Sequence, residues 1–338
     1  MASLGRLRLH TLSASAQATI REMHQNRPWW VVLHYLGLFS AVALIWYLCM
    51  RADSLALWVL GVWWVAVVQH GLYVVHHDAS HFGHFKSKSI TRWVGFGLCV
   101  VPMFHHPEAW SFEQWRRRHV RHHQHLFTFG DPDYANRARR GDTTRAYSRT
   151  DLLRACARTG LTSSVAFFRG RQDAVGPGQA VFYAGAHHHL RTLFRPFVGD
   201  PVMEQERRIK LVAMPLMLAA VAWFGLWTPF LLLWILPMYT VYPALLHLMD
   251  LTEHVWQAED QAIPSNSRST AYGLLARVFI SWYPRPYHRE HHLFPGVLCP
   301  DLPRLARVLA DEGRVAPSSR GIGSLLDSVA CAGAEVRR

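Results

Sequence analysis

The 338-residue chain has few charged residues and no closely spaced pair of cysteines. Only 17% of its residues are charged, whereas half are apolar and 14 are tryptophan. No two of its five cysteines stand at CxxC spacing, so neither a disulfide framework nor a cysteine-zinc site is indicated. No nucleic-acid-binding motif accompanies the net charge of +13. These absences favour a membrane protein over a secreted domain or a nucleic-acid binder.

Four long apolar runs form two pairs. Residues 29–50 and 54–75 are separated only by Arg51-Ala-Asp53, and residues 209–227 and 230–249 only by Thr228-Pro229. Runs of about 20 residues are long enough to cross a hydrocarbon core of roughly 30 Å. We therefore expect an all-α membrane protein whose four transmembrane helices form two hairpins, with a helical cap outside the membrane.

The runs divide the chain into five parts, namely an N-terminal segment at the membrane surface (1–28), a first transmembrane hairpin (29–75), a first cap segment (76–208), a second hairpin (209–249) and a second cap segment (250–338). Residues 93–104 are apolar but too short to span, which predicts a re-entrant segment. The N-terminal segment lacks the apolar stretch of a cleaved signal peptide. The links inside the two hairpins, residues 51–53 and 228–229, lie on the side of the membrane opposite the histidines. They contain only Arg51 as a basic residue, so the positive-inside rule predicts that both termini and the cap are cytoplasmic.

Three histidine clusters lie just outside the apolar runs: His77-Asp-Ala-Ser-His81, His119-Val-Arg-His122-His123 and His288-Arg-Glu-His291-His292. Residues three or four apart share one face of a helix, and imidazole is a good ligand for transition metals. One metal ion rarely takes more than six protein ligands, whereas these clusters offer eight histidines. They therefore predict two metal ions at one face of the membrane.

Other residues near the clusters have the chemistry to support such a site. His254 follows Asp250 by four residues at the end of the last run, which makes it a candidate ninth ligand. Asp250 itself is a candidate ligand, holder of a bound water or orienting group. Metal-bound histidines usually donate their second N–H to a carboxylate or carbonyl. The candidate acceptors are Asp78, Asp131, Asp133, Glu253 and Glu290, although Asp131-Pro-Asp133 is alternatively an ordinary turn. The run His187–His189 is interpreted as a solvated stretch.

Together, HDASH, then WRRRHVRHH leading into GDPDY, then NSRST ahead of YHREHHLFPGVLCPDLPRL resemble the integral-membrane fatty acid desaturase family over roughly residues 69–305. The resemblance implies a non-haem diiron centre that activates O2 and removes hydrogen from unactivated C–H groups of a lipid chain. It implies as iron ligands His77, His81, His119, His122, His123, His254, His288, His291 and His292. Acyl-CoA desaturases of animals and yeast carry Asn where this chain has Asp250.

The expected reaction is desaturation of a fatty-acyl or related lipid chain. Alternatives are hydroxylation or ketolation of a lipid or carotenoid by the same centre, and a histidine-rich metal transporter or sensor. Almost no ionisable residue lies within the apolar runs, which disfavours a metal pathway. No fused haem motif or four-cysteine iron-sulfur pattern is present. The resemblance therefore implies a separate electron donor of ferredoxin, rubredoxin or cytochrome type, and the arginine-rich face is a candidate docking surface for it, for anionic lipid or for an acyl-carrier protein.

Overall fold

The protein is mostly helical. The computed structural model describes residues 7–103, 111–128, 130–134, 148–169, 196, 199–254, 267–283 and 287–321, with the side chains of the 148–169 segment described as far as residue 162. The α-helices are α1 (Ala14–Met23), α2 (Pro28–Arg51), α3 (Leu55–Ser80), α4 (Lys88–Gly95), α5 (Phe112–His125), α7 (Arg149–Arg169), α9 (Pro201–Trp223), α10 (Trp227–Phe230), α11 (Leu236–Tyr239), α12 (Val241–Glu253), α13 (Leu274–Phe279), α14 (His288–Leu293) and α15 (Leu302–Asp311). Short π-helices are η2 (Phe96–Val100) and η4 (Leu231–Ile235), and 3-10 helices are η1 (Leu9–Thr11) and η5 (Cys299–Asp301).

Helices α2 and α3 form the expected first hairpin. Pro28 lies in the first turn of α2, where its missing N–H costs nothing, and the Ser54 hydroxyl accepts from the Leu57 N–H at the start of α3. A short link, from Ala52 to Ser54, joins the two helices. Both are long and apolar enough to cross a membrane.

The third candidate span is the segment from Trp227 to Glu253, which joins α10, η4, α11 and α12. It corresponds to the predicted run 230–249. Gln69 of α3 donates to the Trp234 carbonyl at 2.7 Å, so the first hairpin is tied to this span inside the bundle.

The remaining predicted span, 209–227, falls on α9. This helix begins eight residues earlier than expected, at Pro201, because the Asp200 side chain caps it by accepting from the Met203 N–H. Its first half carries five charged residues, Glu204, Glu206, Arg207, Arg208 and Lys210. Three helices of the described chain, and not α9, are long and apolar enough to span, so the fourth span stays a prediction.

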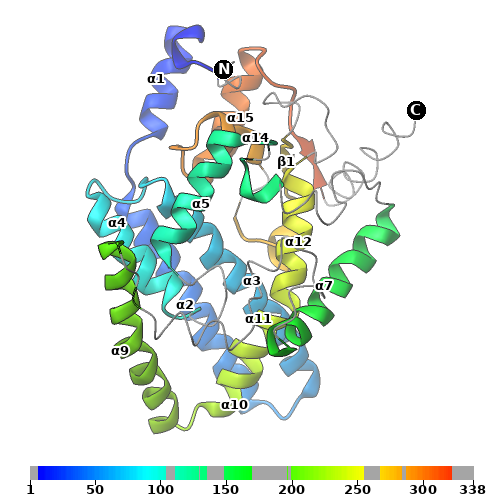
Figure 1. Ribbon diagram of the computed structural model, residues 1–338. Helices are drawn as coiled ribbons and strands as arrows, with labels where there is room; N and C mark the ends of the chain where they lie inside the picture. Colours follow the sequence, from blue (N-terminus) through cyan, green and yellow to red (C-terminus); the bar gives the residue numbers. More distant parts are fainter. Residues whose placement is uncertain are drawn as a thin grey trace.

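The elements have a clear polarity along the bundle (Figure 1). Helices α1, α14 and α15 lie at one end, whereas the α2–α3 link and α10 lie at the other. Residues 96–103, which follow α4, lie beside α3. The Cys99 thiol donates to the Leu72 carbonyl at 3.2 Å, and the Trp234 indole donates to the Pro102 carbonyl at 2.9 Å.

One pair of strands departs from the all-helical expectation. β1 (Thr270–Ala271) and β2 (Ser319–Arg320) pair in parallel, with Thr270 opposite Ser319. The two strands are only two residues long and are distant in sequence, so no alternating pattern marks them. They tie the segment after His254 to the chain that follows α15.

Candidate metal centre

Nine histidines converge where four elements meet at one end of the bundle. They come from the end of α3 (His77 and His81), from α5 (His119, His122 and His123), from the end of α12 (His254) and from α14 (His288, His291 and His292). These are the nine predicted ligands, and all but the partly exposed His81 are buried. Their ring nitrogens fall into two groups, within each of which they lie within 4.8 Å of one another.

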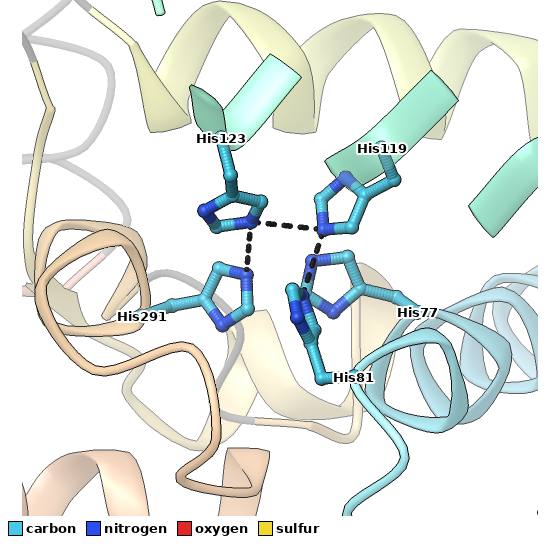
Figure 2. A group of neighbouring side chains, drawn as sticks. All are labelled: His77, His81, His119, His123 and His291. Carbon is cyan, nitrogen blue, oxygen red and sulfur yellow. Dashed lines mark hydrogen bonds between the residues drawn. The ribbon is translucent and has the colours of Figure 1, made fainter. Parts of the chain in front are cut away.

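The first group contains five histidines: His77, His81, His119, His123 and His291 (Figure 2). The Nε2 atom of His119 lies 3.0 Å from that of His81 and 3.0 Å from that of His123. The Nε2 atom of His123 is also 3.0 Å from that of His291. His77 completes the group, with its ring centroid 4.4 Å from that of His119.

The second group contains four histidines: His122, His254, His288 and His292. The Nε2 atom of His288 lies 3.1 Å from that of His254 and 3.0 Å from that of His292. The two groups are adjacent, because the rings of His123 and His292 lie 4.3 Å apart between centroids.

Helix geometry divides each HxxHH motif between the groups. On α5, His119 and His123 are four residues apart and face the first group, while His122 faces the second. On α14 the division is reversed, because His288 and His292 face the second group and His291 the first. The two helices therefore bridge both groups, so neither site can form without α5 and α14.

The spacing of the Nε2 atoms fits a metal ion. Two nitrogens bound at right angles to one metal, each at about 2.1 Å, lie about 3.0 Å apart. The Nε2 atoms of His119 and His123 each face two other Nε2 atoms. A nitrogen with one proton or one lone pair cannot make two good hydrogen bonds of this kind, whereas a shared cation accepts every lone pair.

Burial keeps these imidazoles in the form that binds metal. It lowers the pKa of His119, His123 and His292 well below the usual value, and neighbouring imidazoles lower each further. It also lowers the pKa of His81 to about 3. Neutral imidazole is the ligating form, so protons compete weakly for these nitrogens.

His122 is the exception, because a carboxylate holds its outer nitrogen. Burial alone would lower the pKa of His122, but Asp131 and Asp133 together outweigh it, and the pKa is raised. Asp131 Oδ1 accepts from His122 Nδ1 at 2.9 Å, whereas Asp133 Oδ2 lies 3.6 Å away. This contact leaves Nε2 of His122 for the second group. Asp131 thus takes the predicted orienting position, and it is also the acceptor of a turn through the Asp133 N–H at 2.8 Å.

Asp78 lies beside His77 and is held by a cysteine from a distant part of the chain. Its Oδ1 lies 3.4 Å from His77 Nδ1. It accepts from the Cys299 thiol at 3.1 Å and from the Cys299 N–H at 2.9 Å. Cys299 lies within the last of the quoted motifs, but its pairing with Asp78 could not be predicted from the sequence, because the two residues are 221 positions apart.

The remaining predicted carboxylates divide in the structure. Glu253 Oε2 lies 3.8 Å from His288 Nδ1, close to the predicted arrangement. The outer nitrogen of His254 instead faces the hydroxyl of Ser267 at 3.3 Å, a residue that the sequence reasoning missed. Glu290 is buried but accepts two hydrogen bonds from Arg289, at 3.0 and 2.7 Å. Asp250 lies one turn before His254 on α12, and its three candidate roles stay predictions.

Trp115 is a further neighbour that the sequence did not reveal. Its indole stacks on the ring of His119, with centroids 4.9 Å apart and an interplanar angle of 20°. It comes one turn before His119 on α5 and also contacts the ring of His77 edge-on, with centroids 6.0 Å apart. Among the surplus histidines, His125 is exposed and His76 and His84 are buried outside both groups. His187–His189 lie outside the described residues.

Comparison with known sequences adds a family to this geometry. The sequence profile described as fatty acid desaturase matches residues 53–317. The match begins at the α2–α3 link and ends beyond α15, so it contains all nine histidines. The comparison with curated proteins finds no match.

Proposed function

Because the chain belongs to the fatty acid desaturase family, we propose that it is an O2-dependent membrane oxidoreductase that introduces a double bond into a fatty-acyl or related lipid chain. Membership of the family implies an oxidoreductase. The observation that carries the proposal is the pair of adjacent histidine groups, with five and four ring nitrogens. Their residues fit two iron ions, for which imidazole is a preferred ligand.

Two iron ions would be held by His77, His81, His119, His123 and His291 and by His122, His254, His288 and His292. When bound, they would supply the activation of O2 that an unactivated C–H group requires. The protein's own part is to fix the ligands and to keep water out. Asp131, Asp78 and Ser267 orient His122, His77 and His254, and the site is buried where the helices meet.

Electrons would arrive from a separate carrier of ferredoxin, rubredoxin or cytochrome type. Support comes from the two faces of α5, because its three cluster histidines are buried while Arg117 and Arg121 are exposed. An acidic carrier docked on this outer face would lie one helix diameter from the metal ligands. Glu113 pairs with Arg116 and Arg117 and thereby holds the arginine side chains at this surface.

We propose the topology that the charges favour, with four spans and with both termini and the metal centre on the cytoplasmic side. The fourth span would be the expected run 209–227, of which α9 supplies the residues as far as Trp223. The exposed Arg208 would mark the boundary, because a long basic side chain can extend toward the headgroups. The α2–α3 link and the α9–α10 link would then face the opposite side.

Two measurements test the proposal. Protein purified in iron-containing medium should hold about two iron ions per chain, and a zinc-only protein that does not react with O2 would overturn it. Lipid extracts of cells that express the chain should contain products two mass units lighter than the substrate. Products sixteen mass units heavier would instead identify a hydroxylase.

A further inference from the structure

The segment from Gly273 to Tyr283 joins β1 to the third histidine cluster. It extends away from the histidines and lies along the candidate membrane span α3. Helix α13 of this segment packs against α3. The Trp63 indole of α3 donates to the Phe279 carbonyl at 2.9 Å. At about 1.5 Å per residue, Trp63 lies roughly 21 Å from His77 along α3 and roughly 12 Å from the far end of that helix. The segment therefore reaches deep along a candidate membrane span.

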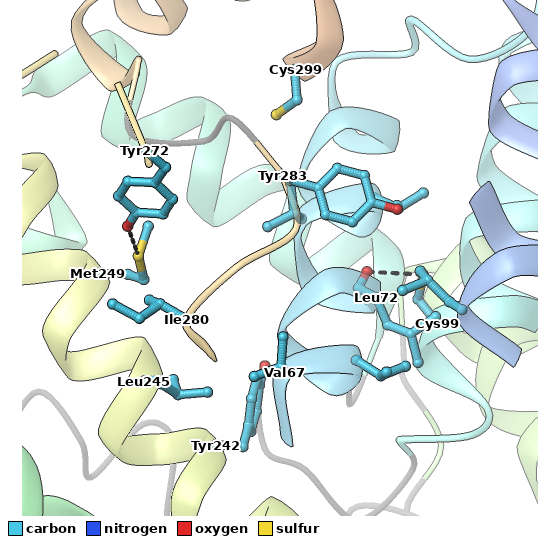
Figure 3. Packing of buried hydrophobic residues seen from close by; sticks show 14 of the residues in the cluster. Val67, Leu72, Cys99, Tyr242, Leu245, Met249, Tyr272, Ile280, Tyr283 and Cys299 are labelled. Carbon is cyan, nitrogen blue, oxygen red and sulfur yellow. Dashed lines mark hydrogen bonds between the residues drawn. The ribbon is translucent and has the colours of Figure 1, made fainter. Parts of the chain in front are cut away.

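Both ends of the segment are anchored near the histidine end of the bundle. The Tyr272 hydroxyl donates to the Met249 sulfur at 2.8 Å, near the end of α12 (Figure 3). The Tyr283 ring packs against the rings of Trp30 and His34 in the first turns of α2, with centroids 6.3 and 5.3 Å away. Between these anchors the chain descends and returns, and Figure 3 shows the returning arm between α12 and α3.

Where the segment turns, its backbone polar groups form hydrogen bonds within the protein. Phe279 gives its carbonyl to Trp63, and the N–H groups of Ile280 and Ser281 donate to the Ala276 carbonyl at 2.9 and 3.1 Å. Ile280 and Ser281 are buried. A chain that leaves the helical conformation at membrane depth is tolerated only where protein surrounds it and its polar groups are paired. This turn meets both conditions.

The outer face of the segment is strongly apolar. Leu274 is 77% exposed and Leu275 is 69% exposed, and the side chains of Phe279 and Trp282 are also partly bare. Trp63 itself and its neighbours Val59 and Leu60 are exposed on the same span. In water such a patch would be costly, whereas beside a membrane span it faces hydrocarbon.

We propose that residues 273–283 form a re-entrant segment whose outer face, centred on Leu274 and Leu275, is covered by the acyl chains of the bilayer. The segment carries a single charge, Arg277, which is exposed. A long guanidinium side chain can extend along the protein surface toward the headgroups. Because Tyr283 precedes the metal-binding helix α14 by only a few residues, the segment couples the bilayer to the third histidine cluster. The assignment does not depend on which metal the histidines hold.

Depth labelling of the full chain in phosphatidylcholine vesicles tests the proposal. An apolar photoreagent that generates a carbene within the acyl chains should label Leu274–Phe279 as strongly as Val59 and Leu60 of α3. Hydroxyl radicals generated in water should label exposed residues of α15, such as Arg307, and spare Leu274–Phe279. Radical labelling of Leu274–Phe279 like that of Arg307, without carbene labelling, would overturn the proposal.

A matched pair of tryptophan variants tests the anchor at depth. Trp63→Phe removes the donor to the Phe279 carbonyl, so hydrogen–deuterium exchange of residues 273–283 should become at least several-fold faster. Trp58→Phe, five residues earlier on α3, removes an indole that makes no hydrogen bond to this segment among the described residues, and it should leave the exchange unchanged. Equal exchange in Trp63→Phe and the parent chain, together with radical labelling of Leu275, would reject the re-entrant placement.

Discussion

The contact between Asp131 and His122 gives the sharpest test of the metal centre. Asp131 is fully buried and uses both carboxylate oxygens. Oδ1 accepts from His122 Nδ1 at 2.9 Å and from the Asp133 N–H at 2.8 Å, and Oδ2 accepts from the Phe127 N–H at 3.1 Å. The same carboxylate therefore holds a histidine of the four-histidine group and closes the turn that follows α5.

Asp131→Asn should weaken the metal at the four-histidine group and leave the five-histidine group nearly unchanged. Loss of such an orienting partner typically lowers metal affinity 10- to 100-fold, which is about 1.4 to 2.7 kcal/mol. An amide also has only one accepting oxygen, so its NH2 group must face a donor, either the Phe127 N–H or His122. That mismatch should cost about 1–3 kcal/mol of stability.

Competition titrations with a chelator would measure the two affinities in Asp131→Asn, in the parent chain and in Asp133→Asn. Asp133 is the matched control, because its carboxylate is 3.6 Å from His122 and 30% exposed. We expect Asp133→Asn to bind both metals almost as the parent does. Unchanged metal binding in Asp131→Asn, or a larger loss in Asp133→Asn, would refute the assignment of Asp131 as the orienting group.

Three further changes probe other features of the molecule. His123→Ala removes a ring whose Nε2 lies 3.0 Å from two other Nε2 atoms, so it should abolish activity and lose about one iron per chain. His125→Ala, on the exposed side of α5, should retain activity and both irons. Normal turnover in His123→Ala would exclude His123 as a ligand. On acidification the four-histidine group should release its metal first, because the raised pKa of His122 lets protons compete with the metal at higher pH. Mössbauer spectra across a pH series would show the order of release, and earlier loss from the five-histidine group would contradict the prediction. Gly160→Val should lower the free energy of unfolding by about 1–3 kcal/mol, because a Cβ there would lie 2.7 Å from the backbone oxygen of Thr240, just before α12. Gly37→Val, with open space around the position, should have little effect on thermal unfolding.

The candidate metal ligands were easier to predict than their division into two groups. Spacing of three or four residues on a helix is visible in a sequence, so the nine histidines could be named and are found together. Their division into five and four depends on how α5 and α14 are rotated against each other. That rotation places His122 and His291 across from their sequence neighbours, and it is set by tertiary packing that no local pattern encodes.

The orienting groups show the same limit. Asp131 lies nine residues after His122, and the turn that it forms with Asp133 follows from local chemistry. Cys299 and Ser267 reach Asp78 and His254 only through the folded chain, so their roles were not accessible. Glu290 has the right side chain within the third cluster, but its neighbour Arg289 takes its carboxylate.

Candidate membrane spans were predictable where the apolar runs are long, and the fourth span, on a helix that begins with charged residues, stays a prediction. The α2–α3 hairpin and the last span follow directly from composition. Helix α9 begins in a charged stretch, so its boundary moved to the Asp200 cap. Helix α13 has only six residues, which is below what a hydropathy pattern can detect.

The arrangement of the ligands ties metal binding to the fold itself. Four segments, from α3, α5, α12 and α14, supply the nine nitrogens, and each HxxHH helix contributes to both groups. Without a cation, nine imidazoles whose lone pairs converge at about 3 Å would oppose the packing that brings them together. With metal bound, the same convergence becomes favourable, and the free energy of binding adds to that of folding. The candidate site is therefore complete only when α5 and α14 are assembled against α3 and α12, and the carboxylates, the thiol and the hydroxyl around the histidines restrict the ring orientations in the absence of metal.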